Sequence, residues 1–118
     1  MRMNYMSIPG VKRMKADYRT MSKEQVLNHT DSIIATVCDQ FNITMKEIKS
    51  NSRKNKIVIP RMLSMYLLRE KTLLTLAEVG EVFGRHHTTA IAAVSASRNM
   101  LETDDVIKQE YQNIIMRL

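Results

Sequence analysis

The most constraining feature of this sequence is a short helical segment that ends at a glycine and is followed at once by a longer helical segment. A capping box that starts at Thr75 begins the first segment, which we expect over residues 76–83. Gly84 then stands where a helix ends in the left-handed conformation. The second segment is expected over residues 87–101. Two helices joined by a tight turn containing glycine form the helix-turn-helix pattern, so we expect the chain to be built around one.

Length and composition limit the rest of the fold to a single helical domain. The chain has 118 residues, of which 44% are hydrophobic and 25% charged, with only 3 Gly and 2 Pro. These values are typical of a globular, helix-rich chain with one modest core. Helical spacing of apolar residues predicts further helices over residues 23–41, 60–71 and 104–118, the last capped by Thr103, and a short helix after Thr44. The expected fold class is a compact, multi-helix all-α domain.

The segment before residue 60 carries two conflicting signals. Residues 51–56 are polar, basic and rich in turn formers, which predicts a loop. Residues 57–59 have the propensity of a short strand, but no partner strand is evident. Pro60 directly after them suits the first position of a helix. We therefore expect a basic loop and then a helix that begins at Pro60.

Positive charge is concentrated in two places. The net charge is +6; residues 1–21 carry five basic side chains and one acidic, and residues 51–62 carry four basic and none acidic. Such clusters indicate a polyanionic partner. The chain has no Trp, 4 Tyr and 2 Phe, too few for a platform that stacks single-stranded bases, so double-stranded DNA is favoured. We divide the chain into a basic N-terminal arm, residues 1–21, and a DNA-binding domain, residues 22–118.

The helix predicted over residues 87–101 has an unusual polar face. One side is expected to pack on the domain and consists of Ala90, Ile91, Val94, Ser97 and Leu101. The opposite side consists of Thr88, Thr89, Ala92, Ser95, Ala96 and Asn99. A face of small hydroxyl, methyl and amide groups, without Lys or Glu, lets a helix enter the major groove and meet base edges. The alternative is that this face packs against a neighbouring helix.

The run from Gly80 to Ile91, GEVFGRHHTTAI, resembles the signature of the C-terminal DNA-binding domain of DnaA, the bacterial chromosomal replication initiator, whose usual form is close to FGGRDHTTVLHA. The resemblance covers roughly residues 29–118. In that family the domain is all-helical. The helix after the signature turn reads the major groove of an A·T-rich site called the DnaA box, and the basic loop reaches the adjacent minor groove.

The resemblance implies a role for individual residues by their position. Arg53 matches the minor-groove arginine, Arg61 the major-groove arginine, and Arg69 a basic position that holds a phosphate. His87, Thr88 and Thr89 match base-contacting residues. The full set of expected DNA-binding residues is Arg53, Lys54, Lys56, Arg61, Arg69, Thr75, Arg85, His86, His87, Thr88, Thr89, Ala92 and Ser95.

Three residues depart from the family pattern. A single Gly84 replaces the usual pair of glycines, His86 stands where Asp is usual, and Met62 stands where Gln is common. The usual Asp is both a helix cap and a base contact. Its replacement therefore bears on which DNA sequence is preferred more than on DNA binding itself.

The expected function is sequence-specific binding of double-stranded DNA at DnaA-box-like sites, in replication initiation or its regulation, by a monomer with other replication proteins as further partners. The alternative is a protein-interaction or RNA-binding module that retains the fold. No GxxxxGK[ST] phosphate loop occurs, so we expect no ATPase activity. The chain is either a stand-alone small protein that has the box-binding domain without the ATPase, or an excised fragment. The sequence does not choose between the two, although Met1 favours a complete reading frame or a fragment made to begin at that residue.

Other classes of function are disfavoured. No nucleophile elbow or paired base is visible, so we expect no enzyme and no catalytic residue. The adjacent pair His86 and His87 lacks further ligands at a suitable spacing, so we expect no metal and no cofactor. Cys38 lies in an apolar helical stripe and is expected to be a buried, inert thiol. With no signal sequence or membrane segment, the expected location is the cytoplasm, at the nucleoid, or the host cytoplasm if the protein is phage-encoded.

Overall fold

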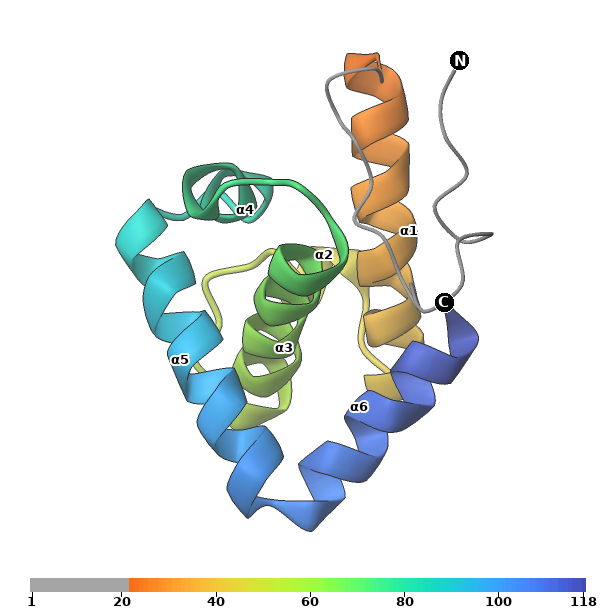
Figure 1. The fold of residues 1–118 in the computed structure, drawn as a ribbon, viewed down its shortest axis with the longest axis vertical. Coiled ribbons are helices and arrows are strands. Elements are labelled where there is room, and N and C mark those ends of the chain that lie inside the picture. Colours follow the sequence, from red (N-terminus) through yellow and green to blue (C-terminus); the bar gives the residue numbers. More distant parts are fainter. Residues whose placement is uncertain (1–21) are drawn as a thin grey trace, which may run out of the picture.

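The computed structural model describes residues 22–118, which form six helices and no strand (Figure 1). The helices are α1 (Lys23–Phe41), α2 (Met45–Ile48), α3 (Asn55–Lys71), α4 (Leu76–Val82), α5 (His87–Thr103) and α6 (Asp105–Arg117). The expected all-α class is confirmed. The predicted basic arm, residues 1–21, lies outside the described residues. No helix in the described part of the chain is long and apolar enough to cross a membrane.

Side chains at the helix starts set most of these boundaries. The hydroxyls of Ser22, Thr44 and Thr75 each accept a hydrogen bond from the backbone N–H three residues later. The Gln or Glu at that later position accepts in return from the N–H of the capping residue. These three capping boxes begin α1, α2 and α4, and the one predicted at Thr75 is confirmed.

The junction between α5 and α6 differs from the expectation by a few residues. We expected the first of these helices to end at Leu101 and Thr103 to cap the second. Instead α5 continues to Thr103, and Asp104 is the cap. The Asp104 carboxylate accepts from the N–H groups of Val106 and Ile107 at 3.0 and 3.1 Å. A carboxylate also interacts favourably with the positive end of the helix dipole, which a hydroxyl does less well.

The start of α3 is the larger correction. The helix begins at Asn55, not at Pro60, so residues 57–59 are helical although their propensity suggests a strand. Pro60 removes only one hydrogen bond from the second turn of the helix. Ile57 and Pro60 are both buried there, and burial of this apolar surface outweighs the lost hydrogen bond and the local propensity.

Helix α3 lies at the centre of the domain and contacts α1, α2, α4 and α5 (Figure 1). Leu67 and Leu68 are fully buried and belong to one core cluster with Ile34 of α1, Val79 of α4 and Ile114 of α6. The apolar residues between Pro60 and Lys71 therefore place this helix in the core. The core therefore fixes the two helices of the helix-turn-helix, α4 and α5, on a rigid support.

Cys38 belongs to the same core and is 4% exposed. Burial raises the pKa of its thiol, with a smaller contribution from the charge of Glu47. The predicted burial is confirmed, and the neutral thiol that results is a poor nucleophile.

Two glycines make the turn between α4 and α5 possible. A Cβ atom on Gly80 would lie 2.7 Å from the carbonyl oxygen of Arg85, so the turn lies too close to α4 for a side chain there. The Arg85 N–H donates to the Gly80 carbonyl at 2.8 Å, which closes the turn. Gly84 has φ +65° with open space around its Cβ position. The single glycine at this position is therefore sufficient for the left-handed turn.

These two glycines should respond differently to substitution. Gly80→Ala should lower the free energy of unfolding by about 1–3 kcal/mol, because the new methyl group meets backbone that cannot yield cheaply. Gly84→Asn, the matched control, should cost about 1 kcal/mol or less, because Asn tolerates the left-handed conformation and the site is open. Urea denaturation followed by circular dichroism measures both values. A larger loss for Gly84→Asn would contradict this description of the turn.

Candidate nucleic-acid interface

The outward face of α5 is open to solvent. Thr88, Thr89, Ala92 and Ser95 are all exposed, so the alternative that this face packs against a neighbouring helix is not supported by the described residues. The buried stripe of α5 consists of Ala90, Ala93, Val94 and Ser97. This is the i, i+3, i+4, i+7 spacing of a helix face that packs on α3 and α4.

One residue of α5 was placed on the wrong face by the sequence reasoning. Ile91 was expected to pack on the domain, but 47% of its surface is exposed. Ala93 occupies the buried position instead. The buried positions of α5 are Ala90, Ala93, Val94 and Ser97, and Ile91 lies outside this stripe. An apolar side chain therefore stands beside the exposed hydroxyl and methyl groups of this face.

His86 takes the capping position at the start of α5. Its Nδ1 accepts from the Thr88 N–H at 3.3 Å and lies 3.0 Å from the Thr88 Oγ1. The His86 ring also packs against the His87 ring, with centroids 4.2 Å apart. The capping role of the usual Asp is thus preserved by an imidazole. Within the described residues, no cluster of three or more His, Cys, Asp or Glu side chains is arranged to hold a metal ion.

Arg61 of α3 anchors the basic loop through hydrogen bonds to backbone carbonyls. This guanidinium is 7% exposed and donates to three backbone carbonyls: Ile48 at the end of α2 at 2.8 Å, and Ser50 and Ser52, which follow α2, at 2.7 and 3.0 Å. Burial, and secondly the nearby charge of Arg85, lower the pKa of Arg61. Three of its five N–H groups are therefore used inside the protein, and two are left for a ligand.

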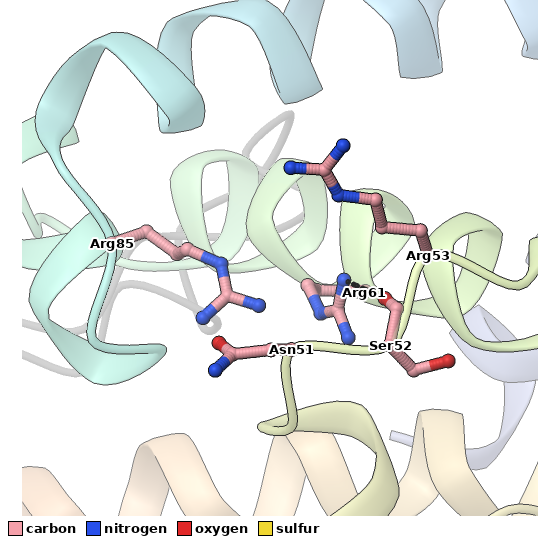
Figure 2. A pocket seen from close by; sticks show the side chains of 5 residues that line it. All are labelled: Asn51, Ser52, Arg53, Arg61 and Arg85. Atoms are coloured by element: carbon pink, nitrogen blue, oxygen red, sulfur yellow. Dashed lines mark hydrogen bonds between the residues drawn. The ribbon is translucent and has the colours of Figure 1, made fainter.

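Arg85, in the turn before α5, joins the loop to the helix-turn-helix. It donates from Nη1 to the Phe83 carbonyl at 3.1 Å and from Nη2 to the Ser50 carbonyl at 2.6 Å. The Ser50 carbonyl thus accepts hydrogen bonds from two arginines that belong to different parts of the fold, Arg61 and Arg85. Figure 2 shows both guanidinium groups converging on the loop.

Between the loop and the turn lies a hollow of about 420 Å³. Its lining consists of Asn51, Ser52, Arg53, Arg61 and Arg85 (Figure 2). Three guanidinium groups and no carboxylate face this space, so it is a positively charged site that favours an anion. Arg53 is exposed and makes no hydrogen bond or ion pair with any described residue, which leaves all five of its N–H groups for a partner.

The remaining predicted residues lie at the edges of these two surfaces. Lys54 and Lys56 are exposed at the start of α3. Arg69 is half-buried and donates to the Leu74 carbonyl at 3.2 Å, and the exposed Thr75 follows as the cap of α4. The structure therefore joins the hollow and the outward face of α5 through the turn at Arg85, whereas Arg69 and Thr75 form a separate group at the other end of α4.

Sequence reasoning missed Ser50 and Asn51. Ser50 contributes its backbone carbonyl, and Asn51 lines the hollow. A backbone carbonyl is present at every position whatever the side chain, so no residue type in the sequence could have marked Ser50 as the shared acceptor. Asn51 had a weak signal, because it is the first residue of the predicted basic loop, two positions before Arg53.

Comparisons with known proteins agree with this geometry. A family profile described as "Bacterial dnaA protein helix-turn-helix" matches residues 30–96. The chromosomal replication initiator protein DnaA of Thermoanaerobacter sp. is 35% identical over 101 residues, which cover 81% of this chain and 23% of that protein. DnaA of Thermus thermophilus is 38% identical over 87 residues, or 73% of this chain and 19% of that protein. The chain thus spans about a fifth of the length of these relatives.

The hydrogen bonds of Arg61 predict a test of its structural role. Arg61→Ala should lower the free energy of unfolding by about 2–4 kcal/mol, because three carbonyls lose a charged donor. Arg53→Ala is the matched control and should change it by less than about 0.5 kcal/mol, since Arg53 has no partner in the described protein. Urea denaturation of both variants measures the difference. Equal stabilities would show that Arg61 does not hold the loop.

Proposed function

This chain belongs to the bacterial DnaA helix-turn-helix family, and from that membership we propose that it binds double-stranded DNA in a sequence-specific way at DnaA-box-like sites. The process it serves is replication initiation or its regulation. Its relatives are named chromosomal replication initiator proteins, and it corresponds to about a fifth of their length. The helix-turn-helix domain described above contributes DNA binding and no ATP hydrolysis or other catalysis.

The observation that carries this proposal is the position of two complementary surfaces on one turn. Arg85 closes the cationic hollow and is followed directly by the exposed, uncharged face of α5. A helix with small polar and methyl groups suits the floor of the major groove, where thymine methyls and base acceptors lie. An exposed arginine suits the narrow, strongly negative minor groove of A·T-rich DNA. The two surfaces together fit adjacent grooves of one duplex.

The residues divide into four roles in this proposal. Thr88, Thr89 and Ala92 contact base edges in the major groove, together with His87. Arg53 enters the minor groove, with Lys54 and Lys56 beside it. Arg61 acts mainly by holding the loop, and two of its N–H groups remain for an anion in the hollow that it lines. The residues that contact phosphates are Arg69, Thr75, Arg85 and Ser95.

Several further properties belong to the same proposal. The protein acts as a monomer in the bacterial cytoplasm, at the nucleoid, or in the cytoplasm of a phage host. Residues 1–21 add positive charge and hence sequence-independent affinity. Other replication proteins are further partners.

A titration of two duplexes tests the proposal directly. At one fixed salt concentration, a duplex with a DnaA box should bind the full chain at least about 100-fold more tightly than a scrambled duplex of the same length and composition, because base contacts add to the phosphate contacts. Fluorescence anisotropy measures both dissociation constants. Equal affinity for the two duplexes would reject sequence-specific binding, and preference for single-stranded RNA or binding of neither nucleic acid would favour the rival functions.

Substitutions should separate base contacts from phosphate contacts. Thr88→Ala and Thr89→Ala should each reduce the discrimination between box and scrambled duplex by about 1–3 kcal/mol. Arg69→Ala should weaken binding to both duplexes equally and reduce the slope of log K against log salt by about one. Because Arg69 also donates to the Leu74 carbonyl, its fold should be checked by thermal denaturation. Identical behaviour of the two kinds of variant would contradict this division.

A further inference from the structure

The hydrogen bonds of His86 fix which of its ring nitrogens carries a proton. The backbone N–H of Thr88 can only donate, and it points at Nδ1 of His86. Nδ1 must therefore be unprotonated, so the capping form of the ring is the neutral imidazole with its hydrogen on Nε2. The Thr88 hydroxyl oxygen lies 3.0 Å from the same nitrogen, and the His87 ring packs against the His86 ring. These two contacts define the orientation of the His86 imidazole.

The outward group of His86 is consequently a hydrogen-bond donor. His86 is exposed and directly precedes the outward face of α5, at the end where that face begins. With Nδ1 occupied by the cap, only the Nε2–H is left for a partner. An aspartate in the same capping position would leave only carboxylate acceptors facing outward. The two side chains thus make the same cap but present opposite hydrogen-bonding groups.

We propose that His86 is a specificity-determining residue that reads a base acceptor in the major groove. The inference rests on the proposed DNA-binding function and adds the base class that this position selects. Guanine fits best, because its major-groove edge carries two acceptors, N7 and O6, and no donor. A carboxylate at this position would instead select cytosine or adenine, whose exocyclic amino groups donate. The chain therefore prefers guanine at the base pair that faces His86.

A pair of nearly isosteric variants isolates this difference. His86→Asn and His86→Asp both replace the capping Nδ1 by a side-chain oxygen that caps α5, so both should fold like the parent. The Asn variant retains an outward N–H donor, whereas the Asp variant has none. Selection from a pool of duplexes with a randomised recognition region, followed by sequencing, gives the base preference of all three full-length proteins.

We expect the parent and His86→Asn to enrich guanine at one shared base pair, and His86→Asp to lose that preference by about tenfold in favour of cytosine or adenine. Ratios of bases are compared because the added negative charge lowers the affinity of His86→Asp for every duplex. The same base enriched by all three proteins would overturn this inference alone. Enrichment of no sequence by the parent would overturn the proposed function and the reading of bases by His86 with it.

The tautomer is measured without DNA. A long-range ¹H–¹⁵N correlation spectrum of the full chain should show Nε2 of His86 protonated and Nδ1 unprotonated at neutral pH. The opposite tautomer would leave an acceptor facing outward and would overturn the inference even if the protein binds its site.

Discussion

The functional surface depends on one backbone carbonyl that two arginines share. Arg61 and Arg85 each donate to the Ser50 carbonyl, at 2.7 and 2.6 Å. Arg61 belongs to the central helix α3, and Arg85 to the turn before α5. The loop that carries Arg53 is therefore attached both to the core and to the helix-turn-helix. A loop fixed in this way loses less conformational entropy on binding than a free one, which strengthens recognition without any new contact.

This arrangement places like charges close together. The charge of Arg85 contributes to lowering the pKa of Arg61, and Arg53 lies on the same hollow without an acidic partner among its lining residues. Repulsion among the three cations works against the free fold and is relieved by an anion in the hollow. The repulsion thus lowers the stability of the free protein and favours the binding of an anion, a compromise that is common at binding sites. The phosphates of DNA are the anions that the proposed function supplies.

The parts of the fold that the sequence predicts well are those set by local interactions. The capping boxes at Ser22, Thr44 and Thr75 depend on residues three positions apart, and Gly84 on its own backbone conformation, so each is visible in the chain. The predicted start of α3 at Pro60 was wrong because burial of Ile57 outweighs its strand propensity. The residue at which α3 begins depends on packing against other helices, and a local sequence pattern contains no information on that packing.

The same distinction holds for the candidate site. The exposed face of α5 could be predicted, since it follows from helical periodicity around Thr88 and Ala92. The structural role of Arg61 could not, because its three acceptors are backbone carbonyls brought together by the fold. The sequence does not distinguish an arginine that faces solvent, as Arg53 does, from one that supports the loop, as Arg61 does, because both stand in the same basic segment.

The central claim is that the basic loop and the start of α5 bind DNA as one rigid unit. An NMR titration of the ¹⁵N-labelled chain with a DnaA-box duplex tests it most directly. The backbone amide signals of residues 50–54 and of the first turn of α5 should shift together and give a single dissociation constant, while those of α6 stay in place. Loop signals that do not move, or that titrate with a different constant from those of α5, would contradict the account.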